Sequence, residues 1–214
     1  MSETVKPELR VTVFSDYTCP FCYVGYVRLE RLRAEYDLKA NWCMIEIHPE
    51  TPESGRPVSE LNYPPEQWHE MMAALQTLAR AEQIVIQPQT YTANTHRALL
   101  LAEAAKEAGR EVFYALHRRL FEAYFGEARN LGDVKVLREL AAATGVSDEI
   151  VARAWEDPQY PARLHQNLKV AQELEVTGTP TYFIGERKLT GALSLDTLRY
   201  AAREASVAAQ QVGA

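Results

Sequence analysis

The first fifty residues hold two short apolar runs with an amphipathic segment between them. The run over residues 9–14 is rich in β-branched side chains and predicts a strand. Apolar residues at helical spacing over residues 23–36 predict a helix, with Thr18 or Asp16 as its cap. Residues 38–47 predict a second strand, with Cys43, Ile45 and Ile47 on one face and Trp42 and Met44 on the other. A strand, a helix and a strand in this order begin an α/β sheet.

The middle of the chain has a different character. Residues 48–65 contain five prolines and Gly55, which predicts a loop. From there to about residue 175 the apolar spacing is helical almost throughout, and Gly145 followed by Ser147 marks the end of one helix and the cap of the next. The expected helices cover residues 65–82, 92–108, 110–124, 131–144, 147–155 and 160–174.

The α/β pattern returns at the end of the chain. Residues 181–184 and 187–190 predict two strands joined by a tight turn, and a last helix is expected from Ser194 or Asp196 to Glu204. The order is therefore βαβ, a series of helices, then ββα. We expect an α/β fold in which residues 1–62 and 158–214 form one domain and residues 63–157 form an all-helical insertion.

Composition narrows the classes of function. The chain has 214 residues, 47% of them hydrophobic and 24% charged, which is ordinary for a globular protein. The net charge of −6 argues against a nucleic-acid partner, which needs clustered Lys and Arg. No apolar run approaches the roughly 18 residues that cross a membrane, so no membrane association is expected. The first ten residues are charged and do not resemble a signal peptide, which predicts a cytoplasmic location.

Cys19 and Cys22 are the strongest candidates for chemistry. Two cysteines separated by two residues lie at the expected start of the first helix. The partial positive charge of a helix N-terminus stabilises a thiolate and lowers its pKa below the value of about 8.5 for a free thiol. Residues three apart also share a helix face, where a disulfide can form. The chain has only one further cysteine, which argues against a secreted disulfide scaffold and for a redox or metal-binding pair.

Zinc is the rival interpretation of this pair. Cys43 and His48 could complete a set of four ligands. They are five residues apart, however, and on one strand such residues face opposite sides. We therefore expect no metal site, and we interpret Cys43 as a core residue beside Ile45 and Ile47.

Four motifs, taken in order, resemble one family. They are residues 15–25 (SDYTCPFCYVG), 46–49 (EIHP), 94–98 (NTHRA) and 176–183 (VTGTPTYF). Together with the βαβ–ββα order, they are similar to the DsbA-like branch of the thioredoxin superfamily. More narrowly they resemble the FrnE-like proteins, relatives of 2-hydroxychromene-2-carboxylate isomerase and of kappa-class glutathione transferases. The resemblance implies a thioredoxin fold with a cis peptide bond before Pro180.

The resemblance also assigns roles. It implies that Cys19, at an exposed helix tip, is the nucleophile, and that Cys22 is the resolving thiol. Pro180 joins them as a catalytic-site residue. Pro20, Phe21 and Thr179 are the expected substrate-binding residues, and Tyr182 would add an apolar contact.

Two departures from the relatives sharpen the expected activity. The isomerase and the kappa transferases typically carry a serine where this chain has Cys19, so a dithiol favours thiol–disulfide exchange. Phe21 stands where periplasmic DsbA has a histidine, and it lacks the charge that would stabilise the thiolate. We expect a less acidic Cys19 and a less oxidising disulfide than in DsbA.

Three functions remain open. The first is a thiol–disulfide oxidoreductase or isomerase that acts on protein substrates, has no cofactor, and uses glutathione or a thioredoxin-type protein as reductant. The second is a glutathione-linked transferase or isomerase of a small aromatic molecule. The third is a redox-switched chaperone or binding protein.

The other polar residues of the motifs are given ordinary roles or are left open. We interpret Asp16 as a helix cap, and His96 and His117 as ordinary helix residues. Asn94 is either a helix cap or a ligand-binding residue, because the resemblance implies that its region borders the active cleft. Glu46 is either a buried acid that accepts the proton of Cys22 or a solvent-facing charge.

Overall fold

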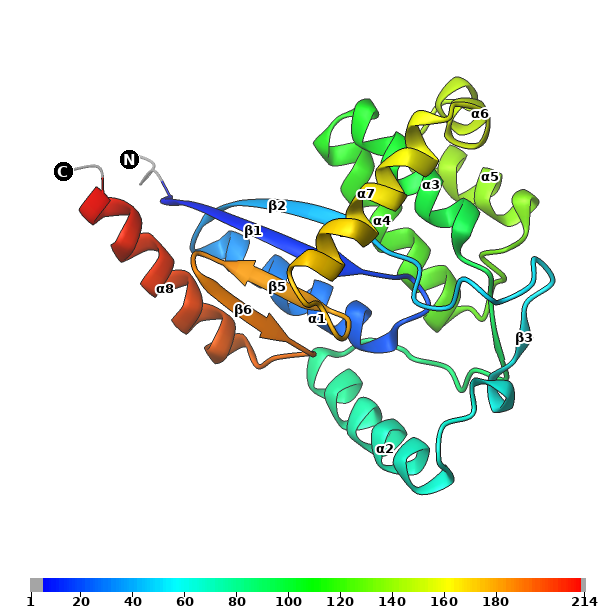
Figure 1. Cartoon of the computed structure of the whole chain (residues 1–214), viewed down its shortest axis with the longest axis horizontal. Coiled ribbons are helices and arrows are strands. Elements are labelled where there is room, and N and C mark those ends of the chain that lie inside the picture. Colours follow the sequence, from blue (N-terminus) through cyan, green and yellow to red (C-terminus); the bar gives the residue numbers. More distant parts are fainter. Residues whose placement is uncertain (1–5, 213–214) are drawn as a thin grey trace.

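A four-stranded sheet forms the centre of the molecule. The computed structural model describes residues 6–212 (Figure 1). The strand order is β2-β1-β5-β6, with β1 parallel to β2 and antiparallel to β5, and β5 antiparallel to β6. This arrangement confirms the expected βαβ–ββα thioredoxin fold. The strands are β1 (Glu8–Ser15), β2 (Asp37–Met44), β5 (Thr181–Ile184) and β6 (Arg187–Thr190).

Helices cover both faces of this sheet. Helix α1 (Pro20–Arg31) connects β1 to β2 and contacts the last helix, α8 (Leu195–Val212), on one face. Because side chains alternate along a strand, Val13 and Tyr182 point to that face. Phe14 and Cys43 point to the other face, where they pack against Ala171. Cys43 is therefore a core residue, as its sequence context predicts.

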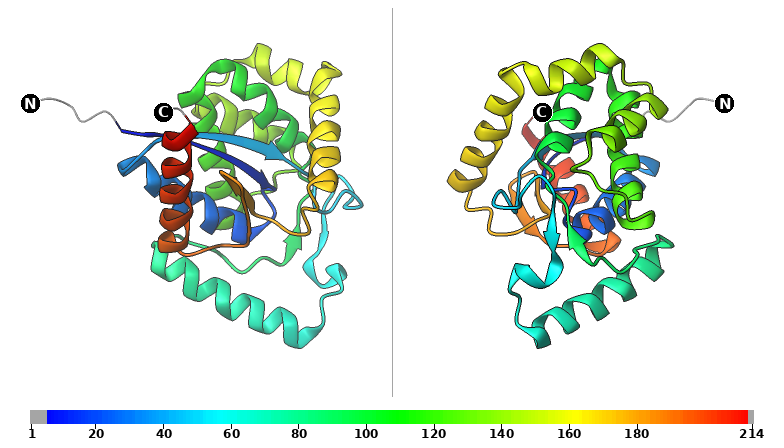
Figure 2. Two further views of the ribbon diagram at one scale, coloured as in Figure 1. Left: turned by 60° about the vertical axis from the view of Figure 1, so that its left-hand side comes forward. Right: turned by 90° about the vertical axis from the view of Figure 1, so that its right-hand side faces the viewer.

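Along the chain, six α-helices separate β1 and β2 from β5 and β6. They are α2 (Pro65–Glu82), α3 (His96–Ala105), α4 (Arg110–Phe121), α5 (Val134–Ala143), α6 (Asp148–Glu156) and α7 (Gln159–Glu173). The loop before α2 and the segment after it pair as a small ribbon of β3 (Arg56–Pro57) and β4 (Tyr91–Thr92). Figures 1 and 2 show α2 at the opposite end of the molecule from α5 and α6.

Most of the expected helices are present, and the differences lie at their ends. Both ends of α2 agree with the prediction, and Ser147 caps α6 through its hydroxyl, which accepts a hydrogen bond from the Ile150 N–H. The helix expected over 92–108 begins only at His96, because Tyr91 and Thr92 pair with β3. α8 runs on to Val212, well beyond Glu204. The expected domain division at residues 62 and 157 stays a prediction.

Two predictions at the first helix are wrong. The helix begins at Pro20 and not at Tyr23, because proline fixes a helical φ and fits the first position of a helix. Cys19 is the N-cap residue, and no side chain accepts a capping hydrogen bond there. Neither Thr18 nor Asp16 is therefore the cap. The second strand also ends early, at Met44, so Ile45 to Ile47 belong to the loop that follows.

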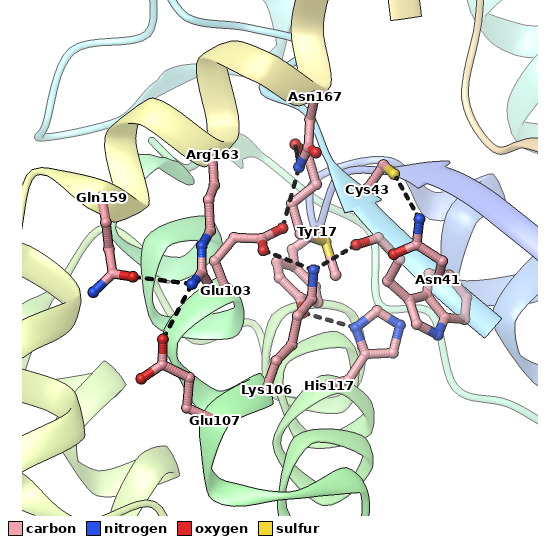
Figure 3. Close-up of polar contacts among 12 residues, drawn as sticks. Tyr17, Asn41, Cys43, Glu103, Lys106, Glu107, His117, Gln159, Arg163 and Asn167 are labelled. Atoms are coloured by element: carbon pink, nitrogen blue, oxygen red, sulfur yellow. Dashed lines mark hydrogen bonds and ion pairs between the residues drawn. The ribbon is translucent and has the colours of Figure 1, made fainter. Parts of the chain in front are cut away.

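Polar side chains of α3, of the turn after it and of α7 contact the end of β2 (Figure 3). The Lys106 ammonium donates to the Trp42 carbonyl at 2.6 Å and to Glu103 at 2.7 Å. The Asn167 amide donates to the Met44 carbonyl at 3.0 Å and to Glu103 at 3.2 Å. Glu103 is only 3% exposed. Glu103 is therefore a buried charge held by Lys106 and Asn167.

Candidate functional site

Cys19 lies where β1 ends and α1 begins. The chain leaves β1 at Ser15, turns over three residues and enters the helix at Pro20. Cys19 is 6% exposed, so the expected exposed helix tip is in fact nearly covered. Cys19 lines a cavity. Cys19 is therefore accessible from this cavity.

The two thiols have opposite electrostatic environments. A hydrogen bond from the Cys22 thiol lowers the pKa of Cys19, with burial acting in the other direction. The start of α1 at Pro20 adds the partial positive charge of a helix N-terminus. Cys22 is fully buried one turn inside, and burial raises its pKa well above the ordinary value. Cys19 therefore loses its proton more readily than an ordinary cysteine, and Cys22 less readily.

The loop before β5 closes over the pair from the second half of the chain. The Thr179–Pro180 peptide bond is cis. The Cys19 thiol donates to the Thr179 carbonyl, with 3.3 Å between the sulfur and the oxygen. The Pro180 carbonyl accepts from the Gly191 N–H at 2.8 Å, which ties the loop to the residue after β6. The structure thus brings Cys19, Cys22 and Thr179 together across about 160 residues of sequence.

The cavity beside Cys19 has a volume of about 630 Å³. Pro20, Phe21 and Thr179 all line it, whereas Tyr182 does not. Tyr182 is fully buried in the core. The expected substrate contact of Tyr182 is therefore wrong. A volume of a few hundred cubic ångströms is typical of small-molecule sites. We call this space the Cys19 cavity.

Helix α2 supplies a wall that sequence reasoning missed. Trp68, Met71, Met72 and Leu75 face the Cys19 cavity from α2. From their helical spacing, Met71 and Met72 look like ordinary packing or surface residues. The only sequence signal was an apolar stripe on a helix, which is the same whether the stripe meets a core or a cavity.

Asp16 and Glu46 lie beside the thiols in different ways. The Asp16 carboxylate accepts hydrogen bonds from the backbone N–H groups of Thr18 at 3.1 Å and Ile47 at 2.8 Å. It therefore joins the start of the active-site turn to the loop after β2. Burial raises the pKa of Asp16, while these two hydrogen bonds lower it. Glu46 lines the Cys19 cavity, and its carboxylate lies 3.1 Å from the His96 Nδ1. This hydrogen bond raises the pKa of His96.

Two further motif residues, Tyr17 and Asn94, make hydrogen bonds close to the site. The Tyr17 hydroxyl lies 2.7 Å from the His117 Nδ1, and both side chains are fully buried (Figure 3). The Asn94 side chain accepts from the His96 N–H at 3.0 Å and donates to the Thr51 carbonyl at 2.7 Å. Asn94 therefore holds the loop after β2 against the start of α3. Within residues 6–212 no group of three or more His, Cys, Asp or Glu side chains is arranged to hold a metal ion.

No helix among the described residues is both long and apolar enough to cross a membrane.

Comparison with known proteins agrees with this geometry. The "DSBA-like thioredoxin domain" family matches residues 10–203. The "Uncharacterized protein YwbO" of Bacillus subtilis (strain 168) is 29% identical over 199 residues, which cover 90% of this chain and 95% of that protein. A crystal structure named "probable DsbA oxidoreductase SCO1869", from Streptomyces coelicolor, superposes with a TM-score of 0.81 at 25% identity, covering 92% of this chain and 90% of the other.

A second solved structure shares the fold at lower identity. It is a 2-hydroxychromene-2-carboxylate isomerase, with a TM-score of 0.75, 20% identity, and coverage of 95% of this chain and 98% of the other. The family match spans nearly the whole chain, including both cysteines and the loop at Pro180. The chain belongs to the DsbA-like thioredoxin domain family.

Proposed function

We propose that this protein is a thiol–disulfide oxidoreductase or isomerase that exchanges disulfides with protein substrates through Cys19 and Cys22. The observation that carries the proposal is the position of Cys19. Its thiol lies at the N-terminus of α1, receives a hydrogen bond that lowers its pKa, and lines an open cavity. These are the features that activate a thiol as a nucleophile.

The reaction proceeds through a mixed disulfide. The Cys19 thiolate attacks one sulfur of the substrate disulfide, forms a bond to it and releases the other sulfur as a thiolate. Cys22 then loses its proton and attacks the Cys19 sulfur, which releases the second substrate thiolate and leaves a Cys19–Cys22 disulfide. Two electrons pass to the substrate, and the reverse sequence oxidises a substrate dithiol. Burial of Cys22 keeps it protonated until the mixed disulfide forms.

The loop at Thr179 supports binding of an extended substrate. Pro180 has no N–H, and within residues 6–212 the Thr179 carbonyl accepts a hydrogen bond only from the Cys19 thiol. When Cys19 joins a substrate, that carbonyl is free to accept a hydrogen bond from the substrate backbone, as in the addition of a strand to a sheet edge.

The test is the reduction of insulin disulfides in the presence of dithiothreitol, followed by turbidity. The wild-type protein should accelerate the reduction, and Cys19→Ser should lose the acceleration. Cys22→Ser should accumulate a mixed disulfide that is visible by mass spectrometry. Cys43→Ser is the matched control, since Cys43 lies in the core away from the cavity. Full activity of Cys19→Ser would overturn the proposal.

A second candidate is a glutathione-linked transferase or isomerase of a small aromatic molecule. The volume and apolar wall of the Cys19 cavity favour it. Calorimetric binding of glutathione to the protein, without turnover of the dithiol, would support this candidate over the first. The redox partner and the cytoplasmic location, expected from the sequence, stay predictions.

A further inference from the structure

The wall of the Cys19 cavity has an unusual distribution of charge. Its described lining contains no Lys or Arg. Glu46 is its only carboxylate, and its remaining polar side chains include the uncharged Gln76, Gln87 and Gln89. Most of the other lining residues are apolar. The one basic side chain among these lining residues is His48, whose Nδ1 lies 3.5 Å from the Glu50 carboxylate. An anion that enters this cavity therefore meets the negative Glu46 and a single histidine that already has a carboxylate partner.

The basic side chains on the surrounding segments are engaged elsewhere. Arg56, two residues before the cavity residue Val58, pairs with Glu50. Lys188 donates to the carbonyls of Leu174 and Glu175, each at 3.1 Å, just before the cavity residue Val176. These contacts hold the cations on carboxylates and carbonyls of the protein itself.

Glu46 is placed to act on a bound ligand. Its side chain is 18% exposed, and it lines the same cavity as Cys19. Its contact with protein is the His96 ring at 3.1 Å, and His96 does not line the cavity. Glu46 thus borders the ligand space, whereas its partner His96 is not among the residues that line it.

We propose that the Cys19 cavity selects uncharged, apolar disulfides and rejects anionic ones, glutathione disulfide among them, and that Glu46 sets this preference. The inference rests on the proposed thiol–disulfide exchange. The occupant is the aromatic or aliphatic group beside the reacting sulfur, which lies between Phe21 and the α2 residues Trp68 and Met71.

The physical reason is desolvation. Proteins bind carboxylates with Arg, Lys or backbone N–H groups, because a buried anion without such a partner loses its hydration without compensation. Glutathione disulfide has four carboxylates and two ammonium groups, so it carries a net charge of −2. The Glu46 carboxylate adds a repulsion that grows as water is excluded. An uncharged aromatic disulfide avoids both costs and gains from contact with the apolar wall.

The experiment compares two small disulfides of opposite character. The reduced protein is mixed with uncharged 4,4′-dithiodipyridine or with the dianion 5,5′-dithiobis(2-nitrobenzoate), and glutathione disulfide is a third reagent. Each rate constant is divided by that of dithiothreitol with the same reagent, which corrects for the intrinsic reactivity of the disulfide. Each reaction oxidises the Cys19–Cys22 dithiol to a disulfide and reduces the reagent to two thiol or thione products, which take up the two protons or release them to the buffer.

For the wild-type protein we expect the corrected ratio of uncharged to anionic rate constants to exceed about tenfold, as expected for like charges at short range. Glu46→Gln should lower this ratio several-fold, and Met71→Lys, which adds a cation to the wall, should lower it further. Glu149→Gln is the matched control, because it removes the same net charge from exposed α6, away from the cavity.

Each outcome decides a different point. A wild-type ratio near one overturns the inference while thiol–disulfide exchange stands. No reaction with any disulfide, although both thiols are reduced, overturns the proposed function itself. Equal effects of Glu46→Gln and Glu149→Gln, or no effect of Glu46→Gln, would show that Glu46 does not set the preference.

Discussion

His117 owes its charge state to the residues around it. It is fully buried, and its ring packs against those of Tyr26, Trp42 and Phe113. The Nδ1 atom lies 2.7 Å from the Tyr17 hydroxyl. Burial, with a smaller contribution from the charge of Lys106, lowers the pKa of His117 to about 3. The folded protein therefore holds a neutral imidazole at pH 7.

This pKa predicts a loss of stability in acid. In the unfolded chain a histidine titrates near 6.5, so below that pH the unfolded state binds a proton that the folded state does not bind. The contribution of His117 is fully present above pH 6.5 and is lost as the pH falls towards 3. Lowering the pH from 7 to 4 should therefore reduce the free energy of unfolding by about 3 kcal/mol through His117 alone.

Urea unfolding at the two pH values measures this loss. His117→Gln keeps an acceptor for Tyr17 but has no imidazole, so its stability should fall by about 3 kcal/mol less than that of the wild type between pH 7 and pH 4. His165→Gln, on the exposed side of α7, is the control and should follow the wild type. If His117→Gln also follows the wild type, the imidazole is not neutral in the fold.

At the scale of elements, one buried ion pair fixes the wall of the Cys19 cavity to α1. Glu82, the last residue of α2, lies 2.7 Å from Arg28 on α1, and their side chains are 6% and 8% exposed. Arg28 also donates to the carbonyls of Ala192 at 3.0 Å and Leu193 at 2.8 Å. Arg31, which is 45% exposed, adds a second contact to Glu82 at 2.6 Å. α1, α2 and the loop before α8 thus share one charged junction.

Removing the shared Glu82 carboxylate should cost far more stability than removing Arg31, the more exposed of its two partners. Glu82→Gln leaves the Arg28 charge buried without a counter-ion, so it should destabilise the protein by about 3 kcal/mol. Arg31→Ala removes a partner that is largely in water and should cost less than about 1 kcal/mol. Urea unfolding compares the two variants. Hydrogen exchange should show faster exchange in α2 for Glu82→Gln, and equal costs for the two variants would contradict the prediction.

At the scale of the whole molecule, the sequence predicts what is local. The ends of α2 follow from Pro65 and from the apolar spacing. Ser147, a preferred N-cap residue, marks the start of α6. The pairing of the cysteines with Pro180 was predictable only through the resemblance. The contact of Tyr17 with His117 joins residues 100 apart, and no local pattern contains it. The same holds for α2 beside Cys19, because an apolar stripe does not say which surface it faces.

The packing of α1 on β5 joins the two halves of the chain, and Gly25 lies at its closest point. A Cβ atom at position 25 would lie 2.0 Å from the Tyr182 hydroxyl oxygen and 3.0 Å from the Pro180 Cγ. That hydroxyl is buried and has no hydrogen-bond partner among the described residues. Glycine is therefore required by the approach of the tyrosine, although alanine is the better helix former by about 1 kcal/mol.

Gly25→Ala should consequently destabilise the protein by about 2 kcal/mol, the usual cost of overpacking a core. Tyr182→Phe removes the clashing oxygen and leaves no group unpaired, so alone it should change stability little. In the double variant the Tyr182→Phe change should recover at least about 1 kcal/mol, measured as a coupling free energy by urea unfolding. Gly126→Ala is the control, because its nearest neighbour would lie 3.8 Å away. A coupling near zero would mean that the two halves of the chain are not held this closely together at Gly25.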